Sequence, residues 1–181
     1  MILGLTYIPN YIDESQEKEL LSSINKFEWD HSLKRKTQHY GYKYDYTTRN
    51  IDSKKDNLGE YPEWLFNIHE IVKSTINKSS DQVIINHYEP GQGIAPHIDN
   101  TNLFDDTIVC LSLGSDIIMN FEKDSVIIPV LLEKRSLVIM RDDSRYLWTH
   151  SIKPVKNNII NGKRIPRSER ISITFRNLKH I

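Results

Sequence analysis

The feature of this chain that most limits its possible folds is a series of short β-branched runs that follows Asp81. Turn residues separate these runs, and hairpin turns are expected at Gly114-Ser115 and Lys123-Asp124. Several short strands at near-regular spacing predict a sandwich or barrel, of which a double-sheet jelly roll is one form. The predicted strands are residues 82–88, 107–113, 117–122, 126–132, 136–140, 146–150 and 170–176.

The part of the chain before Asp81 contains two segments with helical spacing instead. Residues 13–27 open with Asp13 as a possible cap and a charged first turn, after which leucine and isoleucine recur at helical intervals. Residues 62–76 start with a proline, which suits the first turn of a helix, and carry apolar residues on one side. Together with the strands, these segments predict a mainly β, α+β fold with N-terminal helices packed on one sheet.

Length, charge and cysteine content restrict the class of protein. At 181 residues the chain is most economically one domain covering residues 1–181. Basic and acidic residues number 24 each, so net charge gives no argument for nucleic-acid binding, although a local cationic stripe would be hidden in the sum. The single cysteine, Cys110, excludes a cysteine-rich zinc site and is expected to be a small buried hydrophobic residue.

The sequence also restricts location and assembly. It contains neither a recognisable signal peptide nor an apolar run approaching the roughly 20 residues of a membrane helix. We therefore expect an intracellular, cytoplasmic protein without membrane contact, with a nuclear location left open. A monomer is the expected state.

The segment from Asn86 to Asp99 carries the strongest indication of chemistry, because it ends in His97-x-Asp99. Residues i and i+2 of an extended segment point the same way, so both side chains could bind one ion. His150 closes a later predicted strand and is the third candidate ligand. Two histidines and a carboxylate can occupy one face of an iron octahedron and leave three positions for a chelating co-substrate and O₂. The alternatives are a surface turn for His-x-Asp and a merely hydrogen-bonded His150.

The predicted strand at residues 170–176 has two arginines on one face. Period two places Arg170, Ser172, Thr174 and Arg176 together on that face. An inward face with two arginines is costly unless it meets anions, and a dicarboxylic acid would supply two carboxylates for the guanidinium groups. The alternative is an edge strand with a solvated polar face.

Two further segments fit neither the helices nor the strands. Residues 35–50 alternate cations with aromatic rings, a mixture that suits phosphate contacts combined with base stacking. The alternative for this segment is a hairpin whose tyrosines cover the core. Residues 154–169 are polar and basic and are predicted to form a long mobile loop.

Taken together, the motifs resemble those of the AlkB family of Fe(II)- and 2-oxoglutarate-dependent dioxygenases. The motifs that carry the resemblance are Asn86-x-Tyr88, His97-x-Asp99, His150 and Arg170-x₅-Arg176. Residues 88–94, 111–114, 135–137 and 144–150 further resemble the branch whose vertebrate member hydroxylates a modified wobble uridine of tRNA. The resemblance implies a double-stranded β-helix (jelly-roll) core with a nucleotide-recognition lid.

The resemblance also implies roles for individual residues. The implied iron ligands are His97, Asp99 and His150, which with Arg176 would form the catalytic group. The implied 2-oxoglutarate contacts are Asn86, Tyr88, Arg170, Ser172 and Arg176, with Arg170 and Tyr88 at the distal carboxylate. Residues 35–50 would be the lid, and its implied substrate contacts are Arg35, Lys36, Tyr40, Tyr42, Lys43 and Tyr44.

The implied activity, with Fe(II), 2-oxoglutarate and O₂, is oxidation of a modified or alkylated nucleobase. The substrate would be single-stranded DNA, RNA or tRNA, and the product would arise by oxidative demethylation or by hydroxylation of a wobble-uridine side chain. A base inside a duplex would first have to be flipped out. Two alternatives stay open: a hydroxylase or demethylase of protein side chains, and a catalytically silent binding module on the same fold.

Overall fold

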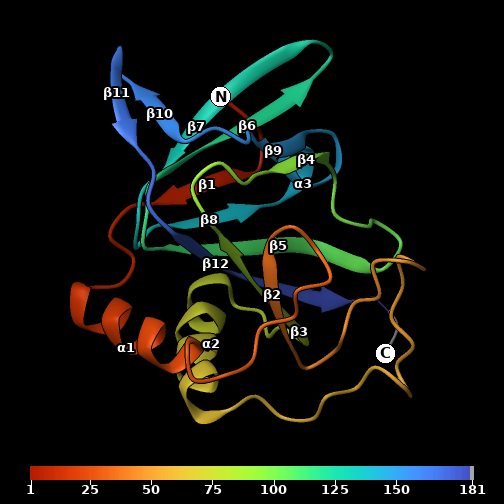
Figure 1. Ribbon diagram of the computed structural model, residues 1–181. Coiled ribbons are helices and arrows are strands. Elements are labelled where there is room, and N and C mark those ends of the chain that lie inside the picture. The colour runs from red at the N-terminus through yellow and green to blue at the C-terminus, as the bar shows by residue number, and fades with distance from the viewer. Residues whose placement is uncertain (180–181) are drawn as a thin grey trace.

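The computed structural model describes residues 1–179, in which two antiparallel sheets face each other (Figure 1). The larger sheet has the order β1-β8-β5-β12-β3-β2 and the smaller one β4-β9-β6-β7. The larger sheet comprises β1 (Leu5–Ile8), β2 (Lys36–Tyr40), β3 (Gln82–Tyr88), β5 (Phe104–Leu113), β8 (Leu137–Met140) and β12 (Arg170–Leu178). The smaller sheet comprises β4 (Ile94–His97), β6 (Ile117–Lys123), β7 (Val126–Leu132) and β9 (Thr149–Ile152). This arrangement is consistent with the predicted double-stranded β-helix.

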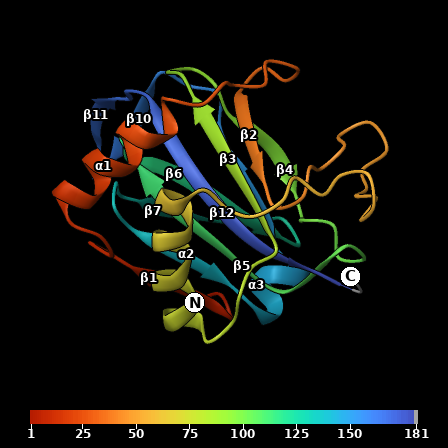
Figure 2. The same cartoon turned by 90° about the horizontal axis from the view of Figure 1, so that it is seen from below.

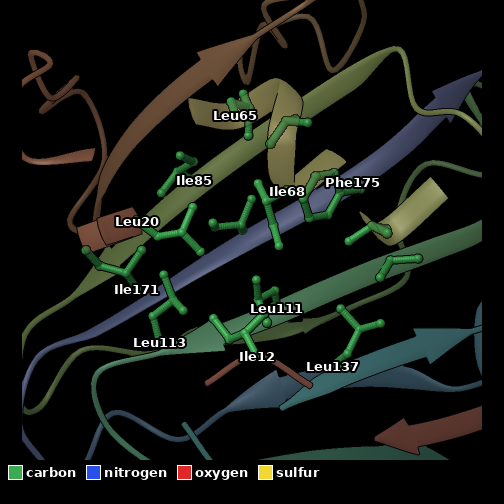
Figure 3. Close-up of a cluster of buried hydrophobic side chains, with 14 of the residues drawn as sticks. Ile12, Leu20, Leu65, Ile68, Ile85, Leu111, Leu113, Leu137, Ile171 and Phe175 are labelled. Atoms are coloured by element: carbon green, nitrogen blue, oxygen red, sulfur yellow. The ribbon is translucent and has the colours of Figure 1, made fainter. Parts of the chain in front are cut away.

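The N-terminal helices α1 (Glu14–Ile24) and α2 (Glu63–Ile76) pack on the outer face of the larger sheet, as predicted (Figures 1 and 2). The backbone N–H of Gln16 donates to the Asp13 carboxylate over 2.8 Å, which caps α1 at the expected residue. The helices and the sheet enclose one hydrophobic cluster (Figure 3). Its members include Leu20, Leu65, Ile68, Ile85, Leu111, Ile171 and Phe175.

Strand β12 divides its side chains between the two faces as period two requires. Ile171, Ile173 and Phe175 belong to the cluster beneath the helices, so the intervening residues point toward the smaller sheet. The strand lies between β3 and β5, and the alternative of a solvated edge strand is therefore wrong. A second hydrophobic cluster, which includes Ile108 and Phe121, fills the space between the sheets around this inward face.

Two sequence-based predictions of local structure in this part of the fold need correction, and one strand was missed. Gly114-Ser115 is not a hairpin turn, because β5 and β6 belong to different sheets and the chain crosses between them there. Residues 146–150 are not one strand: the short helix α3 (Asp142–Tyr146) precedes β9. The first strand, β1, was not predicted. The turn near Lys123-Asp124 does join the paired strands β6 and β7.

Residues 154–169 are not a long irregular loop. They contain the antiparallel hairpin of β10 (Asn157–Ile160) and β11 (Lys163–Pro166). Asn161 and Gly162 form its turn with φ of 50° and 75°, and Asn-Gly is the preferred pair for that conformation. Arg167, one of the basic residues of this segment, is buried and donates to the side chain of Asn158 and to the carbonyl of Lys153.

Residues 35–50, called the lid segment below, are only partly irregular. Their first half is the edge strand β2, and the rest runs in turns along the side of the larger sheet (Figure 2). Within residues 1–179, none of the helices has the length and apolar character needed to cross a membrane.

Candidate active site

The three predicted metal ligands lie together at one end of the space between the sheets. Strands β4 and β9 pair so that His97 stands opposite His150, and their ring centroids are 4.3 Å apart. Asp99 follows β4 directly, and its Oδ2 lies 3.8 Å from Nε2 of His150. Asp99 and His150 are both more than 90% buried. The register of β4 and β9 therefore brings the two histidines together, and the segment after β4 places Asp99 beside them.

The side chains do not yet point at one common centre. Among residues 1–179, no group of three His, Cys, Asp or Glu side chains is arranged so that it could hold a metal ion directly. In His97, Nδ1 lies 2.8 Å from the carbonyl oxygen of Ala95. A carbonyl only accepts, so Nδ1 carries the hydrogen, and in the neutral imidazole Nε2 is then the nitrogen with the lone pair that a metal requires.

The ionisation of these residues suits metal binding. Burial by itself would raise the pKa of Asp99, but Arg176 and then the two histidines outweigh that effect and hold the pKa at about 2. Burial lowers the pKa of His150 to about 4 against the opposing pull of Asp99. At neutral pH the carboxylate is therefore ionised and the imidazole neutral, which are the forms that bind metal.

Arg176 lies directly beside the candidate ligands. Its Nη2 donates to Oδ1 of Asp99 over 2.6 Å, and its guanidinium stacks 4.8 Å from the ring centroid of Phe104. Its Nε is buried without a hydrogen-bond partner in the part of the chain that the structure describes. The residue thus orients Asp99 and retains one donor for a further group.

Arg170 lies farther along the same face of β12, on the strand's inward side. It is 2% exposed, and its Nη2 donates to Oγ of Ser112 over 2.9 Å. Its Nε has no hydrogen-bond partner and no carboxylate lies within ion-pair distance, as far as residues 1–179 are concerned. A buried guanidinium without a counter-ion is costly, and an anion bound there would remove that cost.

The remaining predicted co-substrate residues line the space around Arg170. Tyr88 pairs in register with Arg170, whose guanidinium lies 5.6 Å from the tyrosine ring centroid, and burial raises the pKa of the phenol. Asn86 pairs with Ser172, and Ser172 pairs with Ser112 on the other side. Ser112 was missed, although it lies within the motif at residues 111–114.

A further buried cation, Arg145 of α3, was also missed. It donates to the carbonyl oxygens of Asp99, Phe104 and Asp105 over 2.9 to 3.0 Å and lies 3.4 Å from that of Asn100. The arginine thereby holds the loop that carries Asp99 against the sheet. Its position in an otherwise apolar stretch, residues 144–148, was the available signal.

The lid segment covers the side of the site next to Phe104. Tyr44 packs against Phe104 and Tyr46, with ring centroids 6.0 and 5.1 Å away. Tyr42 and Tyr44 also contact the cluster between the sheets. Asn100, next to the candidate ligand Asp99, donates to the carbonyl of Arg49 at the end of the segment. Covering the core and forming a lid are therefore compatible for these tyrosines.

The predicted substrate contacts in the lid segment point in different directions. Lys43 is exposed. Lys36 forms an ion pair of 3.0 Å with Glu89, and Arg35 donates to the side chain of Asn86 over 2.7 Å. Tyr40 packs between helix-side aromatic residues on the face turned away from His97, so its placement does not suit substrate contact.

Comparisons with known proteins identify the family and the fold. The 2OG-Fe(II) oxygenase superfamily matches residues 4–176. Protein L905 of Acanthamoeba polyphaga mimivirus is 40% identical over 179 residues, covering 97% of this chain and 85% of that protein. The tRNA (carboxymethyluridine(34)-5-O)-methyltransferase alkbh8 of Xenopus tropicalis is 37% identical over 98% of this chain, which spans only 32% of that longer protein. The structure of OsALKBH1 superposes with a TM-score of 0.73 at 17% identity, covering 96% of each chain.

Proposed function

The chain belongs to the 2OG-Fe(II) oxygenase superfamily and is AlkB-like, and from this premise we propose that it is a dioxygenase that oxidises a modified or alkylated nucleobase. The observation that carries the proposal is the inward face of β12. It places the uncompensated Arg170 and the Asp99-bound Arg176 on one strand beside His97 and His150. Such a face suits a dicarboxylic acid lying next to a metal.

The residues present fit the two groups that the family uses. His97, Asp99 and His150 would hold Fe(II), since they supply two imidazole nitrogens and one carboxylate oxygen. Arg170 would pair with the distal carboxylate of 2-oxoglutarate, supported by Tyr88, and Ser172 would lie next to Arg170 on the same face of β12. Arg176 and Asn86 would lie at the other end of the co-substrate. The bound iron and co-substrate would supply the activation of O₂ for attack on a C–H bond.

The protein's own contribution is to orient reactants and exclude water. Arg176 fixes one oxygen of Asp99 by its 2.6 Å contact, which leaves Oδ2 facing His150. Arg145 immobilises the backbone that carries Asp99. Tyr44 is half-buried and packs on the buried ring of Phe104, so a flat base could lie against the accessible part of the Tyr44 ring.

A nucleic-acid substrate is supported by the lid segment and by the relatives. Exposed Lys43 lies one residue from Tyr44, so a phosphate and a base could be contacted together. The name of the frog relative states a carboxymethyluridine at position 34 of tRNA. A base of that class, or an alkylated base in a single strand, is the substrate that we propose.

Product analysis tests this proposal. The protein is incubated with Fe(II), 2-oxoglutarate and either methylated oligonucleotides or tRNA bearing a 5-substituted wobble uridine, with His97→Ala as the inactive control. Formaldehyde, or a mass gain of one oxygen on the nucleoside, together with succinate, is expected from the wild type only. Succinate formed with a protein extract but with none of the nucleic acids would contradict the proposed substrate and favour a protein side chain instead.

A further inference from the structure

The base of the lid is fastened to the segment that carries the co-substrate motif. Three contacts do this: Arg35 Nε to Asn86 Oδ1 at 2.7 Å, Lys36 Nζ to Glu89 Oε1 at 3.0 Å, and Gln92 Nε2 to the carbonyl of Lys34 at 2.9 Å. Two of them are surface contacts at the edge of β2. The contact of Arg35 is different, because it reaches the inward face of the sheet.

Arg35 is held in place from two sides. Its guanidinium lies 5.6 Å from the ring centroid of Tyr46, which in turn packs against His39. Its Nε donates to Asn86. Within residues 1–179, no carboxylate pairs with it. The side chain is half-buried, so its placement beside Asn86 is not that of a cation extended into solvent to meet phosphates.

The contact decides which way the Asn86 amide faces. An amide offers an oxygen that accepts and an NH₂ group that donates, and here the oxygen is taken by Arg35. Turning the amide over would bring its NH₂ against the guanidinium, where two donors face each other. The NH₂ group of Asn86 is therefore the end left for a ligand, and among residues 1–179 the only side-chain hydrogen bond of Asn86 is the one that its oxygen accepts from Arg35.

We infer that Arg35 is a positioning residue of the co-substrate site, which fixes Asn86 so that its NH₂ group donates to an oxygen of 2-oxoglutarate. This inference rests on the proposed function and reassigns Arg35, which the sequence predicts to contact the nucleic-acid substrate. It also ties the lid to co-substrate binding, since the same residue belongs to both.

The test measures binding without turnover. 2-Oxoglutarate is titrated calorimetrically into Mn(II)-loaded protein, for the wild type, Arg35→Gln, Arg35→Lys and the control Lys54→Gln, which removes an exposed cation farther along the same loop. Supporting contacts of this kind typically change ligand binding by about tenfold. We expect Arg35→Gln to weaken 2-oxoglutarate binding by about that factor, Arg35→Lys to restore part of it, and Lys54→Gln to match the wild type.

Asn86→Ala and the double variant separate positioning from direct contact. If Arg35 acts through Asn86, Arg35→Gln adds little to the loss already caused by Asn86→Ala. Additive losses would mean that Arg35 contacts the co-substrate directly. If Arg35→Gln instead has wild-type affinity for 2-oxoglutarate but binds oligonucleotides more weakly, Arg35 is a substrate contact. Either result overturns the inference. If the wild type itself binds no 2-oxoglutarate, the proposed function fails instead. Thermal unfolding of each variant shows that the fold is intact.

Discussion

Arg170 is 2% exposed and, within residues 1–179, has no carboxylate partner. Single residues of this kind limit the possible ligands more than the fold does, because a charge buried without compensation is stable only if something else neutralises it. Asp99 shows the opposite case: Arg176 and His150 already surround it. The protein itself thus supplies the counter-charges of Asp99, whereas neutralising Arg170 requires a ligand.

Replacing Arg170 should therefore have opposite effects on stability and on binding. In Arg170→Met the unpaired charge is gone and the side chain has a similar volume, so we expect the ligand-free protein to be more stable by about 1 kcal/mol. Binding of 2-oxoglutarate should be lost. Urea unfolding and titration calorimetry measure the two quantities, and the exposed Arg164→Met should change neither. A destabilised variant that still binds would show that Arg170 is structural.

Arg145, in contrast, is predicted to stabilise the fold rather than to bind a ligand. Arg145→Ala leaves three buried carbonyl oxygens without their donor, those of Asp99, Phe104 and Asp105. We expect a loss of about 3 kcal/mol of unfolding free energy, measured by urea denaturation. Arg164→Ala is the matched surface control. A loss of less than 1 kcal/mol would mean that water replaces the arginine without difficulty.

At the scale of secondary-structure elements, features that depend on neighbouring residues could be predicted from the sequence, whereas features that depend on distant residues could not. The helix cap at Asp13 and the alternation of β12 are local, and both were predicted. The crossing at Gly114 depends on which sheet each strand joins, which is a tertiary property. The turn at Asn161-Gly162 is also local, but it lies in a segment that was predicted to be a loop.

The hairpin formed by β10 and β11 should depend on its turn. Gly162 has φ of 75° and no atom would touch an added Cβ, so Gly162→Ala changes only the backbone energy. We expect backbone amides of residues 157–166 to exchange with solvent about fivefold faster, equivalent to about 1 kcal/mol of local stability. Amides of β12 should be unaffected. Unchanged exchange throughout the hairpin would contradict the structure of this turn.

The site as a whole could be predicted as a set of residues but not as a geometry. His97, Asp99 and His150 are separated in sequence and meet because β4 pairs with β9, which no local pattern reveals. Arg35 and Tyr40 belong to the same lid segment in sequence, yet one reaches Asn86 and the other packs beneath the helices. Their different roles follow from the position of β2 at the edge of the larger sheet.

Acid should destabilise the metal-free molecule through its buried histidines. Burial lowers the pKa of both His39 and His150 to about 4, whereas the unfolded value is near 6.5. Below pH 6.5 the unfolded state binds protons that the folded state does not, so stability is full above that pH and falls as pH approaches 4. Between pH 7.5 and 5.5 each histidine should remove about 1 kcal/mol. Urea unfolding at each pH measures the unfolding free energy, and His39→Gln should make it depend less on pH. An unfolding free energy that rises as the pH falls from 7.5 to 5.5 would contradict the assignment.

The central claim is that this chain binds Fe(II) and 2-oxoglutarate together at His97, Asp99 and His150. The most direct measurement is the visible absorption spectrum after anaerobic addition of Fe(II) and 2-oxoglutarate, because the chelated pair gives a charge-transfer band. We predict that the wild type and the exposed-histidine control His31→Ala show the band and that His97→Ala does not. Absence of the band in the wild type, or its persistence in His97→Ala, would contradict the account.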